Sequence, residues 1–230
     1  MDFAGMQSLT LLDFPNKVAC ILFVRGCNFR CPFCHNASLV CGDAENTFQE
    51  ADVLAFLKKR QGLLDGVVIS GGEPTLYPEL IPFLQKVRAL GYAIKLDTNG
   101  TNPTLLKQIV GEGLVDFVAM DIKNSPHFYS ATCGVPKADM ASIEESRNFL
   151  MDGNVDYEFR TTVVDGLHTK ESIDELARWI AGAKRYYLQV FKDSGHLLHP
   201  ENLQAFDEKG MVELLEIAKK HIPNAQLRGI

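Results

Sequence analysis

The chain has 230 residues, of which 46% are hydrophobic and 23% are charged, and this ordinary globular composition can bury a full core. Its net charge of −6 argues against a nucleic-acid partner, because neutralising phosphates requires a basic face. No apolar run reaches the roughly 18 residues that a membrane span needs, and the N-terminus lacks a signal-peptide pattern, so we expect a cytoplasmic protein without a membrane partner.

Strand and helix patterns alternate along the chain. In chain order we predict a strand at 17–24, a helix at 47–60 with Thr47 as its cap, a strand at 66–70, a helix at 77–91, a strand at 92–100, a helix at 102–113, a strand at 115–123, a helix at 137–153, a strand at 155–164, a helix at 169–183, a strand at 185–191, a helix at 208–221 and a final strand within 224–230. Six strand-to-helix units in sequence imply a parallel sheet covered by helices.

This order of elements predicts an α/β fold. A closed (β/α)8 barrel usually takes about 250 residues, so we expect a partial, open (β/α)6 barrel that forms a single domain of residues 1–230. Residues 1–16 would be an N-terminal extension that packs on the barrel. A flat, doubly wound sheet is the alternative. Both folds place functional side chains at the carboxyl ends of the strands.

Polar motifs follow the predicted strands at these ends. They are the cysteines Cys27, Cys31 and Cys34 after the first strand, "SGGEPT" (70–75) after the second, "DTNG" (97–100) at the end of the third, "DIK" (121–123) at the end of the fourth, and Arg160 within the fifth. Because the carboxyl ends of parallel strands meet at one edge of a sheet, we expect these motifs to form one site.

The three cysteines are spaced C-x3-C-x2-C, which gives three ligands where thiolate metal sites usually have four. One interpretation is a zinc site completed by His35 or Cys41. The other is a [4Fe–4S] cluster with one iron left open for a reactive ligand, and the lack of a second C-x2-C pair favours it. We expect Cys20 to be a small buried apolar residue, and Cys41 and Cys133 to be structural.

The run "RGCNFRCPFCHN" resembles the C-x3-C-x-aromatic-C signature of the radical S-adenosylmethionine (SAM) superfamily. The resemblance implies the partial barrel of that superfamily and three cysteine-bound irons of a [4Fe–4S] cluster beside Phe33, with SAM on the fourth iron. It also implies reductive cleavage of SAM to methionine and a 5′-deoxyadenosyl radical. Gly71, Gly72 and Glu73 resemble the superfamily's glycine-glycine-glutamate element, which implies that they line the methionine part of SAM.

The "DTNG" and "DIK" motifs resemble those of glycyl-radical-enzyme activators. This resemblance implies that Asp97, Thr98 and Asp121 bind a monovalent cation and that Lys123 contacts SAM. It also implies that Arg160 reaches the SAM carboxylate. A salt bridge from Arg160 to a strand-end Asp is the alternative, because a charge in a buried strand needs a partner.

The family often packs a His from its sixth strand near the adenine of SAM. This chain has "YYLQVFKD" there, so Gln189 or Phe191 would take that place. "CHN" also resembles the activators, which implies that His35 lies near the cluster, most simply in a structural role.

The start of the chain resembles the short anaerobic ribonucleoside-triphosphate reductase activating proteins, except for Asn16 and Arg25, where Gly and Gln are usual. Cysteines for a ferredoxin-like insert are missing. The resemblance implies hydrogen abstraction from a glycine of a glycyl-radical enzyme, with a one-electron donor such as flavodoxin or ferredoxin. The alternatives are an activator of another glycyl-radical enzyme, of the pyruvate formate-lyase kind, and a radical SAM enzyme acting on a small molecule such as a deazapurine precursor.

Overall fold

The computed structural model of the protein describes residues 1–41, 48–193, 195 and 197–229. Its strands are β1 (Gly5–Thr10), β2 (Ala19–Val24), β3 (Gly66–Gly71), β4 (Ala93–Thr98), β5 (Phe117–Asp121), β6 (Asp156–Val163), β7 (Tyr186–Val190) and β8 (Ala225–Arg228). Its helices are α1 (Ala37–Cys41), α2 (Glu50–Lys59), the 3-10 helix η1 (Pro74–Leu76), α3 (Leu80–Ala89), α4 (Pro103–Gly111), α5 (Tyr129–Thr132), α6 (Met140–Met151), α7 (Lys170–Trp179) and α8 (Glu208–Lys219).

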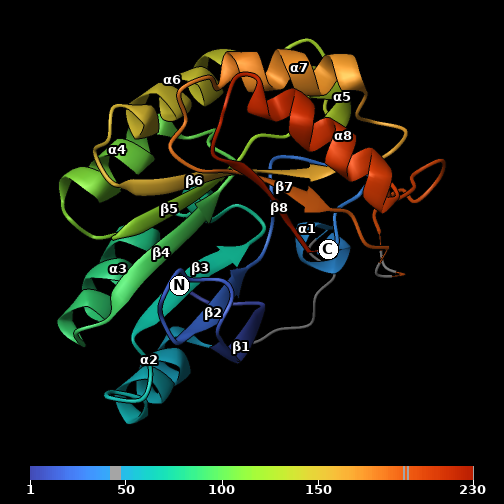
Figure 1. The fold of residues 1–230 in the computed structure, drawn as a ribbon. Helices are drawn as coiled ribbons and strands as arrows, with labels where there is room; N and C mark the ends of the chain where they lie inside the picture. Colours follow the sequence, from blue (N-terminus) through green and yellow to red (C-terminus); the bar gives the residue numbers. More distant parts are fainter. Residues whose placement is uncertain (42–47, 194, 196, 230) are drawn as a thin grey trace.

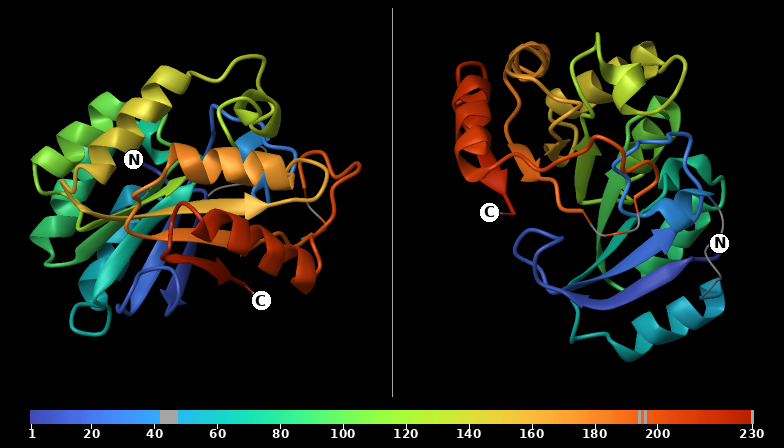
Figure 2. Two further views of the ribbon diagram at one scale, coloured as in Figure 1. Left: turned by 45° about the horizontal axis from the view of Figure 1, so that its top comes forward. Right: turned by 90° about the vertical axis from the view of Figure 1, so that its right-hand side faces the viewer.

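The strands form one sheet in which each strand pairs with its neighbours in the chain. β2 to β8 run parallel, and β1 runs antiparallel to β2. No pairing between described residues joins β8 to β1, so the sheet curves without closing (Figures 1 and 2). Helices α3, α4, α6, α7 and α8 cover its outer side (Figure 1). This confirms the predicted partial, open (β/α)6 barrel. The flat, doubly wound alternative is wrong, because its strand order would reverse at a switch point.

The structure adds short elements that the sequence patterns did not predict. Residues 5–10, treated only as part of an N-terminal extension, form the edge strand β1. α1 and α5 are helices of five and four residues, too short to show a helical period. Helix α2 begins at Glu50, and its N-cap residue, Gln49, makes no side-chain cap. The predicted cap, Thr47, lies outside the described residues.

Side-chain caps start four of the helices that return the chain to the sheet. Asn102, Asp139 and Asp207 accept a backbone N–H from the first turn of α4, α6 and α8. Thr169 and Ser172 form a reciprocal capping box at α7. The caps fix where these loops end, and the loops before α4 and α6 carry the "DTNG" and "DIK" motifs.

Two apolar clusters hold the sheet from its two sides. The larger one packs the outer face of the sheet against the helices. The smaller one lies inside the barrel and contains Phe14, Ala19, Ile21, Val68 and Phe117. Because Ala19 and Phe117 begin β2 and β5, this inner cluster fills the amino ends of the strands and leaves the carboxyl ends to polar side chains.

Within the described ranges, none of the helices has the length and apolar character that crossing a bilayer requires.

Candidate active site

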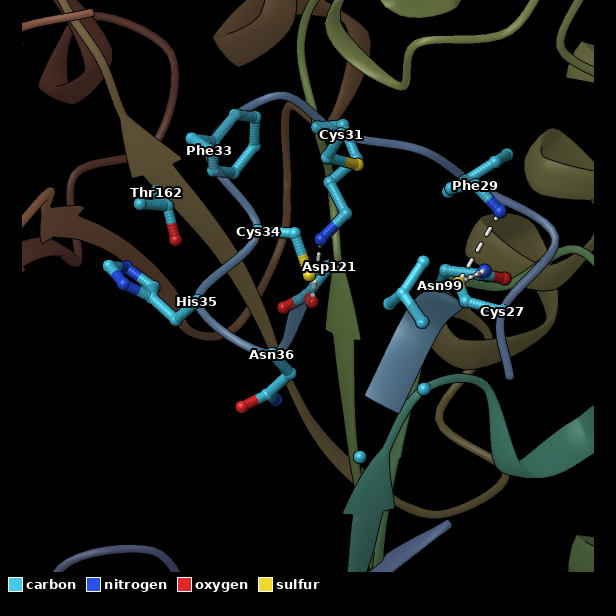
Figure 3. Close-up of a pocket in the computed structure, with 14 residues that line it drawn as sticks. Cys27, Phe29, Cys31, Phe33, Cys34, His35, Asn36, Asn99, Asp121 and Thr162 are labelled. Carbon is cyan, nitrogen blue, oxygen red and sulfur yellow. Dashed lines mark hydrogen bonds and ion pairs between the residues drawn. The ribbon is translucent and has the colours of Figure 1, made fainter. Parts of the chain in front are cut away.

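A cavity of about 170 Å³ lies at the carboxyl ends of the strands (Figure 3). The lining residues are Cys27, Phe29, Cys31, Phe33, Cys34, His35, Asn36, Val40, Gly71, Gly72, Asn99, Asp121, Lys123 and Thr162. The structure therefore brings the three signature cysteines, the glycine pair and the "DIK" motif to one cavity. Of the other predicted site residues, Glu73, Asp97, Thr98 and Arg160 lie behind this wall.

The loop that carries the cysteines is held by backbone contacts on both sides. The Gly26 N–H donates to Leu39 O of α1 at 2.8 Å, and the Arg30 N–H donates to Cys133 O at 2.8 Å. A Cβ on Gly134 would lie 2.1 Å from Arg30 O, so glycine is required for this close approach. Residues 129–134 thus form a support for the loop, a role that the sequence did not reveal.

Each cysteine has a different hydrogen-bonding environment. The Phe29 N–H and the Asn99 side chain donate to Cys27 Sγ, at 3.4 and 3.8 Å, and burial raises the pKa of the Cys27 thiol to about 11. A hydrogen bond with the Cys133 thiol lowers the pKa of Cys31 to about 7. Burial also raises the pKa of Cys34. Two of the three sulfurs therefore need a bound metal to be held as thiolates at neutral pH.

The three cysteine side chains bear on the two metal hypotheses. Among the described residues, no group of three His, Cys, Asp or Glu side chains is gathered as a site for one metal ion. An iron–sulfur cluster is held by Cys thiolates on its irons. Cys27, Cys31 and Cys34 all line one cavity, and this donor set fits a [4Fe–4S] cluster with one iron left open.

The glycine pair allows two loops to touch. A Cβ on Gly72 would lie 1.7 Å from Gly26 O, and one on Gly71, which has a φ of 112°, would lie 2.4 Å from Val24 N. The Glu73 N–H also donates to Gly26 O at 2.9 Å. The sequence suggested that these glycines make room for a ligand. In the structure they line the cavity, and their lack of a side chain lets β3 approach the cysteine loop.

Glu73 connects the "SGGEPT" loop to the "DTNG" turn. Its side chain is buried, and it accepts hydrogen bonds from Thr75, Thr98 Oγ1 at 2.7 Å and the Asn99 N–H at 2.6 Å. Burial raises the pKa of this carboxyl, and the hydrogen bonds oppose that shift. The predicted contact of Glu73 with SAM stays a prediction.

Charged side chains form a network beneath the cavity. Asp97 pairs with Lys95 at 2.5 Å and with Arg160 at 3.4 Å. Asp121 pairs with Arg160 at 2.8 Å and with Lys123 at 2.9 Å. Burial opposes ionisation of both carboxyls, but the neighbouring cations outweigh it and lower both pKa values. In this structure Arg160 makes the ion pairs of the salt-bridge alternative, and its predicted contact with the SAM carboxylate stays a prediction. The monovalent cation stays a prediction, and in this structure cationic side chains neutralise the two carboxylates proposed for it.

The two candidates for the adenine wall differ in position. Phe191 is buried, and its ring centroid lies 5.7 Å from that of His35, which lines the cavity. Gln189 is partly exposed on β7. Neither residue lines the cavity itself. Phe191 reaches the cavity only through the ring of His35, which packs against it and does line the cavity.

Both the sequence and the fold of this chain resemble those of known proteins. The sequence profile of the Radical SAM superfamily matches residues 21–180. A Methanocaldococcus jannaschii protein named as a glycyl-radical enzyme activating enzyme is 30% identical over 99% of this chain and 95% of its own. A 7-carboxy-7-deazaguanine synthase from Koribacter versatilis is 30% identical over 67% of each chain. The structure of a radical SAM methyltransferase from Sphaerobacter thermophilus shares the fold, with a TM-score of 0.74, 14% identity and coverage of 96% of this chain and 68% of its own.

Proposed function

This chain belongs to the radical SAM superfamily, and on that premise we propose that it activates a partner enzyme by removing a hydrogen atom from one of the partner's glycines. The observation that carries the chemistry is the arrangement of Cys27, Cys31 and Cys34 around one cavity with Lys123. The observation that favours an activator is the similarity to the M. jannaschii protein along almost the whole of both chains.

The superfamily implies a [4Fe–4S] cluster and SAM, which together supply a 5′-deoxyadenosyl radical when bound. In this chain the three cysteines would hold the cluster. Lys123 and Asp121 stand on the cavity wall with opposite charges, so they suit the carboxylate and the amino group of the methionine part. Phe29 and Phe33 provide apolar walls that exclude water from the reacting atoms.

The residues behind the wall would act on the ligand through their neighbours. The hydrogen bond between Glu73 and Thr98 holds the "DTNG" turn in place, and the ion pair from Arg160 holds Asp121 in place. Gly71 and Gly72 would offer their backbone to the methionine part. A monovalent cation near Asp97, Thr98 and Asp121 remains part of the proposal, and its binding would require the present ion pairs to rearrange.

The proposed substrate is a glycine-bearing loop of a large enzyme, most simply an anaerobic ribonucleoside-triphosphate reductase. Support comes from the open barrel, because the described strands β1 and β8 are not paired with each other, and a sheet that is not closed would give an extended chain a side to enter that a closed barrel would deny. The "RGCNFRCPFCHN" run supports the same class. A small one-electron protein such as flavodoxin or ferredoxin would supply the electron.

A second candidate is a small-molecule reaction of the deazapurine type. The Koribacter versatilis synthase favours it, because its identity to this chain equals that of the M. jannaschii protein, although over less of the sequence. The two functions differ in where the hydrogen comes from, and an experiment can separate them on that basis.

The test is electron paramagnetic resonance of an anaerobic mixture of the reconstituted protein, SAM, a reductant and purified candidate partners. We expect a glycyl radical on one partner, which disappears with Cys27→Ala and with a partner whose radical-site glycine is replaced by alanine. 5′-Deoxyadenosine formed with a deazapurine precursor, and no protein radical with any partner, would contradict the proposal and favour the second candidate.

A further inference from the structure

Asn99, in the "DTNG" turn, lines the cavity beside Cys27 (Figure 3). The residue is buried, with 5% of its surface exposed. Nδ2 donates to Cys27 Sγ at 3.8 Å and to Asn28 Oδ1 at 2.8 Å. One side-chain amide therefore reaches both a cysteine sulfur and the residue that follows it in the cysteine loop.

The orientation of this amide is fixed by the rest of its hydrogen bonds. Oδ1 accepts from the Thr101 N–H at 3.0 Å and from Thr101 Oγ1 at 2.7 Å. The backbone N–H of Asn99 donates to the buried Glu73 carboxylate at 2.6 Å. Rotating the amide by 180° would set Nδ2 against the Thr101 N–H and Oδ1 against Asn28 Oδ1, so the donor must face the sulfur.

We propose that Asn99 is a positioning residue for the cluster, whose N–H stabilises the iron-bound sulfur of Cys27. The Phe29 N–H, at 3.4 Å from the same sulfur, is its backbone partner in this role. Donors facing an anionic sulfur form charge-assisted hydrogen bonds, and hydrogen bonds to cluster sulfurs raise the reduction potential of the cluster.

The inference rests on the cluster that the superfamily implies and not on the identity of the partner. The Asn99 hydrogen bond would set the reduction potential of the cluster, and this potential decides how readily the cluster takes the electron that it passes on. Glu73 would contribute indirectly, because its carboxylate accepts the backbone N–H of Asn99 and holds that residue in place.

The experiment compares Asn99→Ala with two matched controls after anaerobic reconstitution. Asn102→Ala removes a neighbouring side-chain amide, which donates to Thr75 O at 2.8 Å and accepts from the Leu105 N–H at 3.1 Å. Thr101→Ser removes only a methyl group and keeps the hydroxyl that contacts Asn28 and Asn99. Both controls alter the segment after the turn and keep the hydrogen bonds that hold the Asn99 amide. The readouts are iron and sulfide per chain, circular dichroism, and a redox titration of the cluster followed by electron paramagnetic resonance.

We expect Asn99→Ala to lower the midpoint potential, with a reduced-to-oxidised ratio at fixed potential that falls on the order of tenfold. The controls should stay close to wild type. Selective loss of the cluster from Asn99→Ala, with normal secondary structure and loaded controls, would support the same role. An unchanged potential in Asn99→Ala, or equal changes in all three variants, would overturn it. A wild-type protein that takes up no iron would instead refute the superfamily chemistry.

Discussion

Replacing Gly72 with alanine tests how tightly the cavity wall is built. The new Cβ would lie 1.7 Å from Gly26 O, which is 1.3 Å short of the 3.0 Å that real Cβ atoms keep. The nearest atoms all belong to the Gly26 backbone, so the two loops must separate. That movement breaks the hydrogen bond from the Glu73 N–H to Gly26 O, now 2.9 Å. Overpacking of about 1–3 kcal/mol and a lost hydrogen bond of about 1 kcal/mol give a destabilisation of about 2–4 kcal/mol.

Urea unfolding of the cluster-free protein, followed by circular dichroism, measures this loss. Gly111→Ala is the matched control, because Gly111 ends α4 and a Cβ there meets nothing within 4 Å. The control should be unchanged or more stable by up to about 1 kcal/mol. Because Gly26 precedes Cys27, we also expect Gly72→Ala to take up less iron. A Gly72→Ala protein with wild-type stability and iron content would refute the reasoning.

Two further predictions concern the metal ligands and the charge network. Alanine at any one of the three cavity cysteines should abolish cluster uptake, whereas Cys41→Ala, at an exposed cysteine, should keep it, and normal iron content in a cavity-cysteine variant would contradict the ligand assignment. Arg160→Met should cost about 3 kcal/mol in unfolding free energy at pH 7, the low end for a broken buried pair, because Lys95 and Lys123 still pair with the two carboxylates. The wild-type pKa values of Asp97 and Asp121 are lowered, so their stabilisation is present above the ordinary value of about 3.9 and is lost as the pH falls through the folded values. The difference between wild type and variant should therefore be constant from pH 7 to about pH 4 and shrink as the pH falls below that value, and a difference that stays constant below about pH 4 would argue against the ion pairs.

The parallel strands and crossover helices were predictable because their patterns are local. A β-branched apolar run such as 19–24 marks a buried strand, and the repeated strand-to-helix order indicates a partial barrel. Strand β1 was not predictable in this way, since "GMQSLT" is no apolar run and is defined by its pairing with β2. Ends of strands shifted by one or two residues because hydrogen bonding to the neighbour decides where pairing stops.

The site was predictable where a motif lines the cavity directly, as the three cysteines and Lys123 do. The sequence could not show that Glu73 and Arg160 form hydrogen bonds and ion pairs with other residues of the chain, because those partners lie far away in sequence. The contacts that Asn99 and Cys133 make with the cysteine loop were missed for the same reason, although Cys133 was expected to be structural. Each contacts the cysteine loop only through the fold, and neither belongs to a spacing that indicates a metal ligand.

The central claim is that the protein takes a hydrogen atom from a partner's glycine. Its most direct test is a partner enzyme labelled with deuterium at glycine, incubated anaerobically with the reconstituted protein, SAM and a reductant. Mass spectrometry of the 5′-deoxyadenosine then reports the source of the hydrogen. We predict one deuterium per 5′-deoxyadenosine, with a matching glycyl radical on the partner. Unlabelled 5′-deoxyadenosine formed in full amount with a protein partner present would contradict the claim.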